Sequence, residues 1–145
     1  MISITEHPID IQAILRSIHT LHSGAVDCFI GTIRNKSHGR QVNALEYTAY
    51  VEMAEKQMRE IEGEIKKKWM LHNIALVHRI GLLQVGDIAV VTAVSSAHRA
   101  EAFESCRYAI DRIKAVVPIW KKEIFEEGNA WVVGQHDVDF VGGGT

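Results

Sequence analysis

The sequence has few of the residues that hold together disulfide-rich or metal-stapled domains. Cysteine occurs only twice, at Cys28 and Cys106, and these positions match no common metal-ligand spacing. Neither a disulfide framework nor a zinc module is therefore indicated. Because thiols stay reduced in the cytosol, where structural disulfides are rare, we predict a cytoplasmic protein.

Long apolar runs and an excess of positive charge are also absent from the sequence. No stretch approaches the roughly 18 apolar residues of a membrane span, and the first ten residues carry acids and a proline where a secretory signal needs an apolar run. The formal net charge is −2, whereas proteins that bind the nucleic-acid backbone usually carry a basic excess. We therefore predict no membrane contact and no nucleic-acid partner, and any cationic site must be local.

The composition that is present is that of an ordinary globular domain. Apolar residues make up 47% and charged residues 23% of the chain. A chain of this length can bury roughly 70% of its unfolded surface and needs no covalent staple. We predict a single domain over residues 1–136 and a flexible tail over residues 137–145, which end in VGGGT.

Three segments show the apolar spacing of three and four residues that is typical of helices. They are a segment that begins near Pro8, residues 51–70, and residues 98–117. The third helix is expected to bury one stripe of residues: Phe103, Cys106, Ile110, Ile113 and Val117. Ser95 and Ser96 are the candidate N-caps of this helix.

Other segments alternate apolar and polar residues, as strands do. These predicted strands are residues 2–5, 25–33, 42–50, 73–81, 88–96, 119–125 and 130–133. Consecutive strands are expected to pair, beginning with a hairpin of residues 25–33 and 42–50 and ending with two pairs formed by the last four strands. Because strands and helices mix without regular alternation, the predicted class is α+β with a mostly antiparallel sheet.

Cationic residues gather near both ends of the third predicted helix. Lys114 stands just before Pro118, which ends the helix, and the following strand can return Lys121 to the same pocket. His98 and Arg99 lie in the first turn, where unpaired backbone N–H groups and the helix dipole favour an anion. These positions predict binding of an anionic small molecule.

Arg34 at the exit of a predicted strand would add a planar fork for phosphate or carboxylate. Each cation also has a structural explanation. A lysine such as Lys114 near a helix C-terminus commonly compensates the dipole, and Arg99 can pair with Glu101 or Glu104. Spacing alone leaves the structural and the functional interpretation open.

Five stretches of the chain carry motifs that occur together in one protein family. In order they are GTIRNKSHGRQVNALEYTAYVEMAE, VHRIGLLQVGD, SSAHRAEAFE, IDRIKAVVPIWKKE and EEGNAWV. With G-x-x-R-N, an His-Arg pair and K-x-x-x-P-x-W-K-x-E together, the chain resembles the molybdopterin synthase catalytic (large) subunit family. On the family pattern Lys114 and Lys121 match the catalytic lysines, and Arg34, His98 and Arg99 match substrate-binding residues.

The resemblance implies an α/β hammerhead-like fold and a sulfurtransferase. Such enzymes convert cyclic pyranopterin monophosphate into molybdopterin by installing two sulfurs as a dithiolene. The sulfur arrives as a thiocarboxylate on the C-terminal Gly-Gly of a small ubiquitin-like carrier subunit, so no cofactor and no metal are expected. The implied assembly is a central homodimer with one carrier at each end, a heterotetramer.

The resemblance also suggests roles for the cations. Arg34, His98 and Arg99 would hold the pterin phosphate. Lys114 would act as general acid or base or contact the thiocarboxylate carbonyl, and Lys121 would stabilise developing negative charge.

The surroundings of these residues add expectations and one departure. Pro118 and Trp120 are expected to wall the site and exclude water. Bacterial members often have a basic residue shortly after the closing Trp-Val pair, but here that region reads VGQHDVDF, with His136 as the stand-in.

Two functions from other classes stay open on the sequence alone. A noncatalytic module that binds a phosphorylated pterin or nucleotide would not need both lysines. A structural or regulatory dimer partner would bind the small protein without any dependence on pterin.

Overall fold

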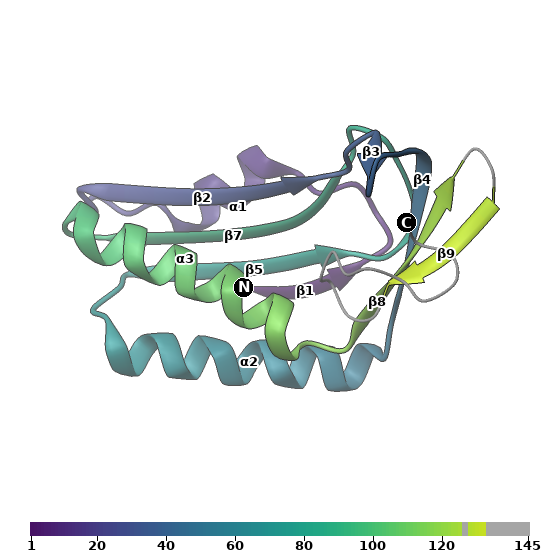
Figure 1. Ribbon diagram of the computed structural model, residues 1–145. Helices are drawn as coiled ribbons and strands as arrows, with labels where there is room; N and C mark the ends of the chain where they lie inside the picture. Colours follow the sequence, from purple (N-terminus) through teal and green to yellow (C-terminus); the bar gives the residue numbers. More distant parts are fainter. Residues whose placement is uncertain (126–127, 133–145) are drawn as a thin grey trace.

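Two sheets and three helices organise the part of the chain that this computed structural model describes, residues 1–125 and 128–132 (Figure 1). Helix α1 (Ile11–Ile18) packs on one face of a four-stranded sheet. Helices α2 (Val51–Lys68) and α3 (Arg99–Val116) lie on its other side. The predicted α+β class is confirmed, whereas the predicted tail lies outside the described residues.

The helices form where the apolar spacing predicts them. Asp10 caps α1, because its Oδ1 accepts a hydrogen bond of 3.0 Å from the backbone N–H of Ala13. Helix α2 buries one stripe of residues: Ala54, Met58, Ile61 and Ile65. None of the helices in the described ranges is long and apolar enough to cross a bilayer.

The start of α3 differs from the prediction. Ser95 and Ser96 belong to strand β7 (Ile88–Ser96), and the N-cap residue is His98. Both hydroxyls are committed elsewhere: Ser95 Oγ donates to the last carbonyl of α1 at 2.7 Å and Ser96 Oγ donates to the His98 carbonyl at 2.6 Å. The core assignment of Phe103 is also wrong, because its side chain is 61% exposed.

The four-stranded sheet joins segments that are far apart in the sequence. Its order is β1 (Ile2–Thr5), β5 (Asn73–Arg79), β7 and β2 (Ala25–Thr32). The pair of β1 and β5 is parallel and the other pairs are antiparallel. The predicted hairpin of residues 25–33 and 42–50 is therefore wrong, since β2 pairs with β7 and the second segment lies in the other sheet.

The five-stranded sheet carries the C-terminal part of the described chain. Its strands are β3 (Lys36–Ser37), β4 (Arg40–Ala49), β6 (Gly81–Gln84), β8 (Ile119–Phe125) and β9 (Gly128–Val132). Strand β4 lies between β6 and β8, and β8 pairs with β9 as predicted. The β4–β8 register places Tyr47 opposite Lys121 and Leu45 opposite Glu123.

The core is divided by the four-stranded sheet. The larger cluster, between the sheets and helices α2 and α3, includes Cys106, whereas Cys28 packs with the smaller cluster beneath α1. The two cysteines therefore lie in different clusters, and both are free thiols.

Candidate active site

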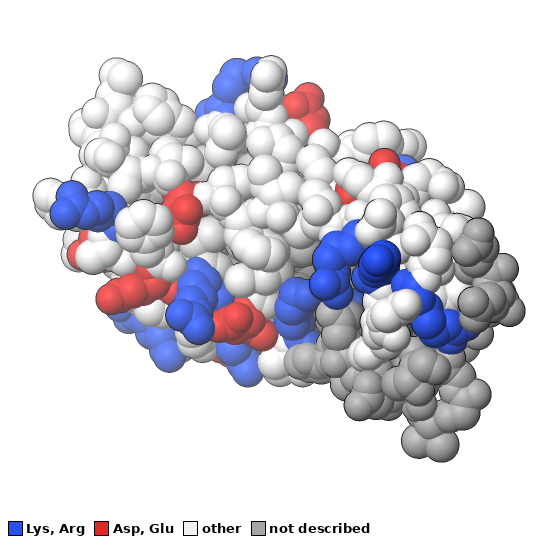
Figure 2. Space-filling model, turned by 45° about the horizontal axis from the view of Figure 1, so that its top comes forward, with Lys and Arg blue, Asp and Glu red and all other residues white. Residues whose placement is uncertain are grey.

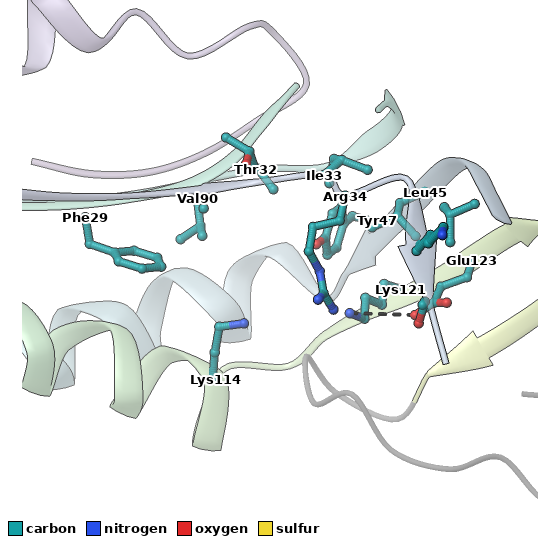
Figure 3. A pocket seen from close by; sticks show the side chains of 15 residues that line it. Phe29, Thr32, Ile33, Arg34, Leu45, Tyr47, Val90, Lys114, Lys121 and Glu123 are labelled. Atoms are coloured by element: carbon teal, nitrogen blue, oxygen red, sulfur yellow. Dashed lines mark ion pairs between the residues drawn. The ribbon is translucent and has the colours of Figure 1, made fainter. Parts of the chain in front are cut away.

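A cleft opens where the C-terminal end of α3 meets the end of β2 and the strands β4 and β8 (Figure 3). Its cavity volume is about 120 Å³, against the roughly 10–15 Å³ that one water requires on the same scale. The charged lining residues are Arg34, Lys36, Lys114, Lys121 and Glu123. Four cations and one carboxylate suit an anionic ligand that also carries hydrogen-bond donors.

The two predicted catalytic lysines line this same cleft. Lys114 lies in the last turn of α3 and is exposed. The helix then ends at Val117, whose N–H donates to the Ile113 carbonyl at 3.1 Å, and Pro118 cannot continue it. The chain turns into β8 and brings back Lys121, which is only 9% exposed. The predicted convergence of the two lysines is confirmed.

Glu123 is a site residue that the sequence analysis did not single out. The residue is 1% exposed and lines the cleft, and its carboxylate Oε1 lies 3.8 Å from Lys121 Nζ. Both residues face the same side of β8 because they are two positions apart on a strand. The signal in the sequence was that Lys121 and Glu123 occupy alternate positions of a short predicted strand whose first and last residues, Ile119 and Phe125, share the same face, so an apolar face also carries two charges.

Arg34 follows β2 and also lines the cleft, with an exposed side chain. The β2–β7 register shifts between Gly31 and Thr32, so the ladder is irregular just before the arginine. The preceding residue is held on both sides: Ile33 N–H donates to the Asp87 carbonyl at 3.0 Å and its carbonyl accepts from Gly86 N–H at 2.8 Å. These bonds fix the backbone from which Arg34 projects.

The floor of the cleft is supported by an aromatic pair. Tyr47 lines the cleft and packs edge-on against the buried His78, with ring centroids 4.9 Å apart. His78 Nδ1 lies 2.7 Å from the Arg79 carbonyl, so this nitrogen carries the proton. The hydrogen bond holds the imidazole, and the imidazole in turn supports Tyr47.

His98 and Arg99 do not lie in this cleft. They stand at the N-terminal end of α3, and Lys114 stands at the opposite end of the same helix. Fifteen residues of helix separate Arg99 from Lys114, which is about 22 Å along the axis at 1.5 Å per residue. Both side chains are exposed, and their predicted role in binding stays a prediction.

The predicted wall of Pro118 and Trp120 is wrong for the cleft in the described chain. Neither residue lines it. Trp120 alternates with Lys121 along β8, lies opposite Thr48 on the other face of the sheet, and is 42% exposed. The cleft is instead walled by apolar residues that include Phe29 and Val90 (Figure 3). His136, the predicted stand-in for a basic residue, lies outside the described residues.

The molecular surface, like the lining of the cleft, carries more positive than negative side chains in one region. Figure 2 shows Lys and Arg side chains gathered on one part of the face, with few acidic residues among them. Within the described ranges, no group of three or more His, Cys, Asp or Glu side chains is arranged to hold a metal ion.

Comparisons with known proteins agree on one family. The sequence model described as MoaE protein matches residues 4–116. The molybdopterin synthase catalytic subunit of Halalkalibacterium halodurans is 47% identical over 133 residues, covering 92% of this chain and 85% of that protein.

Solved structures support the same assignment. The crystal structure of molybdopterin synthase from Staphylococcus aureus matches with a TM-score of 0.85 and 46% identity, over 89% of this chain and 94% of that chain. A complex of subunits 1 and 2 of molybdopterin-converting factor from Helicobacter pylori contains the same fold, with a TM-score of 0.74 and 18% identity over 90% and 88% of the two chains. By sequence and by fold, this chain belongs to the MoaE family, the family of the molybdopterin synthase catalytic subunits.

Proposed function

We propose that this chain is the catalytic subunit of a molybdopterin synthase, which converts cyclic pyranopterin monophosphate into molybdopterin. The observation that carries the proposal is the convergence of Lys114, Lys121 and Arg34, from three separate segments, on one cleft. A pterin phosphate needs cations for its phosphate and apolar walls for its rings, and the cleft supplies both. The name of the Halalkalibacterium halodurans relative supports the same activity.

The chemistry of the reaction gives the cations separate tasks. Opening the cyclic phosphate leaves negative charge on the phosphate, and the leaving oxygen needs a proton. Arg34 holds the phosphate through its planar guanidinium. Lys114 delivers the proton as a general acid, and Lys121, in its buried position, stabilises the charge that develops.

The sulfur enters from a small carrier subunit whose C-terminal Gly-Gly ends in a thiocarboxylate. The thiocarboxylate sulfur bonds to a carbon of the substrate side chain as the oxygen on that carbon leaves with a proton. Water then breaks the carbon–sulfur bond to the carrier and supplies the oxygen of the carboxylate that remains on the carrier tail. The terminal anion is attracted by the same cations, and a glycine tail needs little width in the cleft. The Helicobacter pylori complex of two subunits supports assembly with a small partner.

A homodimer reconciles the two groups of cations at opposite ends of α3. One cleft with Lys114 cannot receive Arg99 of its own chain across about 22 Å of helix. A second copy of the chain can present its His98 and Arg99 to that cleft, so each substrate is held by residues of both subunits.

The proposal is tested by combining the protein with a thiocarboxylated Gly-Gly carrier and cyclic pyranopterin monophosphate and measuring dithiolene product. We expect Lys114→Ala to lower the rate at least about 100-fold, because the proton donor is lost. Its stability should stay within about 0.5 kcal/mol of the parent, since the side chain is exposed.

Lys122→Ala is the matched control. Lys122 neighbours Lys121 on β8, does not line the cleft, and should leave the rate unchanged. Full activity of Lys114→Ala would contradict the role of this lysine. Absence of product from the parent, with the carrier still bound, would favour a noncatalytic binding module.

A further inference from the structure

Two buried polar atoms in the cleft have no hydrogen-bond partner among the described residues. They are Oε2 of Glu123, a residue that is 1% exposed, and Oγ of Ser37, a residue that is 7% exposed. Both residues line the cavity, and they come from different strands, β8 and β3. Buried polar groups are nearly always hydrogen-bonded in native proteins, so these two atoms mark a place where a bound ligand would supply the hydrogen-bond partners.

The ion pair with Lys121 does not by itself explain why Glu123 is buried. The separation of 3.8 Å between Glu123 Oε1 and Lys121 Nζ is longer than a hydrogen bond. The attraction within a buried ion pair offsets the free-energy cost of desolvation only when the two charges are close and the remaining lone pairs of the carboxylate accept hydrogen bonds. Glu123 Oε2 accepts no hydrogen bond from the described residues, so the carboxylate can accept one from a further donor.

Charge changes sign along the cleft. In Figure 3 the labelled side chains run from Lys114 through Arg34 and Lys121 to Glu123. The cations attract an anionic group, whereas a carboxylate repels an anion and accepts hydrogen bonds from N–H groups. The ligand that matches this order has an anionic group at one end and N–H donors at the other.

We propose that Glu123 is a specificity-determining residue that accepts hydrogen bonds from the 2-amino group and the ring N3–H of the pterin. These two donors are adjacent and coplanar, so they match the two oxygens of a carboxylate as a guanidinium does. The Ser37 hydroxyl, which lines the same cavity, provides a second polar contact for the ligand. The inference rests on the proposed function, and it orients the substrate with its pterin ring at Glu123 and its phosphate toward Arg34.

The peptide N–H groups of a carrier tail share this donor chemistry, but they match the site less well. An extended peptide directs successive N–H groups to alternate sides, so it offers one donor where the carboxylate accepts two. The terminal anion of the tail would also be repelled by Glu123. The pterin edge is therefore the occupant that the charges and the geometry favour.

The experiment compares the binding of two anionic ligands that differ only at the recognised edge. Pterin-6-carboxylate has the 2-amino group, and lumazine-6-carboxylate has a carbonyl oxygen in its place. Calorimetry on the parent should show a preference for the pterin of at least about 10-fold, because a site built to hydrogen-bond a donor rejects the analogue that lacks it. In Glu123→Gln we expect this preference to disappear or invert, since a carboxamide offers one donor and one acceptor and so matches lumazine.

Two further variants keep the test decisive. Glu46→Gln makes the same change on β4, on the opposite face of the sheet from Glu123, and should keep the pterin preference. Glu123→Asp keeps the charge beside Lys121 but withdraws the carboxylate, and it should also lose the preference. Melting temperature and far-UV circular dichroism establish that each variant is folded.

The possible outcomes separate this proposal from the proposed function. An unchanged pterin preference in folded Glu123→Gln, even with a lower rate, would overturn the recognition role and leave only a role in placing Lys121. Weaker carrier binding with an unchanged pterin preference would assign Glu123 to the carrier tail and overturn the proposal. If the parent binds neither ligand, both this inference and the proposed function fail.

Discussion

The two lysines of the cleft differ in burial, and this difference separates their effects on activity and on stability. Lys114 projects from the exposed last turn of a helix, where substitutions usually change stability by no more than about 0.5 kcal/mol. Lys121 is nearly buried beside Glu123, which is more buried still. Removal of the first lysine should therefore change stability little, whereas the second belongs both to the site and to the interior.

Replacement of Lys121 should destabilise the protein as well as inactivate it. Lys121→Met leaves the Glu123 carboxylate buried without its cation, which should lower the free energy of unfolding by about 3–5 kcal/mol. Urea denaturation measures this change. The double variant Lys121→Met/Glu123→Leu should recover most of the stability and none of the activity. A single variant as stable as the parent would show that the ion pair is unimportant for folding.

The cysteines provide a prediction about reactivity. Burial raises the pKa of the Cys106 thiol to about 11, and burial followed by the charge of Asp27 raises the pKa of Cys28. At pH 8 only about one Cys106 in a thousand is the reactive thiolate. Iodoacetamide should therefore modify Cys28 slowly and Cys106 only after unfolding, as read by mass spectrometry. Rapid modification of Cys106 in the native protein would contradict its burial.

A cluster of polar side chains joins helices α2 and α3. Glu64 of α2 accepts hydrogen bonds from Tyr108 Oη at 2.7 Å and from Arg112 Nε at 3.2 Å. The Tyr108 ring also packs edge-on against Trp69, with centroids 5.3 Å apart. The cluster aligns the two helices, and it thereby helps to set where the end of α3, with Lys114, meets the sheet.

This cluster should make stability depend on pH. The hydrogen bond from Tyr108, followed by that from Arg112, holds the pKa of Glu64 below its ordinary value of 4.5. A lowered pKa adds stability above the pKa of the unfolded chain, and this contribution is lost as the pH falls through the folded pKa. Tyr108→Phe should thus cost up to about 1 kcal/mol at pH 7, and the difference should shrink below pH 4.5.

Thermal melts of parent and variant between pH 7 and pH 3 measure this difference. Asp111→Asn is a suitable control, because its ion pair with Arg107 lies on the exposed face of α3. That change should have little effect at either pH. An equal loss of stability from Tyr108→Phe at all pH values would assign the effect to packing of the ring and not to Glu64.

At the scale of the whole molecule, α3 separates two sets of predicted site residues. The cleft contains Lys114, Lys121 and Arg34, while His98 and Arg99 lie about 22 Å away along the helix. Under the proposed homodimer, the distant pair acts on the cleft of the other copy. The proposed homodimer predicts how a mixture of two inactive variants behaves.

Mixing two inactive variants should restore activity. In a mixed dimer of Lys114→Ala and Arg99→Ala, one cleft carries both changes and the other carries neither, if Arg99 acts across the interface. Random exchange of subunits should then recover about a quarter of the parent rate, because half of the dimers are mixed and each has one intact site. No recovery in a mixture shown to exchange subunits would place Arg99 and Lys114 on one chain's site.

The sequence predicted correctly those features that depend on patterns of neighbouring residues in the chain. Apolar periodicity predicted all three described helices, and the break at Pro118 predicted that Lys114 and Lys121 would share a pocket. Of the three predicted strand pairs, the two formed by the last four strands are confirmed and the hairpin of residues 25–33 and 42–50 is wrong, because an alternating pattern shows which residues share a face and not which strand lies beside them. The expectation that Trp120 walls the site is wrong, because its place on β8 turns it to the exposed face.

The sequence by itself determined the α+β class, the helices, the position of the two lysines on either side of the helix end at Pro118 and the resemblance to one family, because each depends on residues close together in the chain. Only the tertiary structure decided that β2 pairs with β7, that Glu123 is buried beside Lys121, and that His98 and Arg99 stand apart from the cleft. These features depend on contacts between distant segments. Which of these contacts form is set by the burial of the whole core and not by any local pattern.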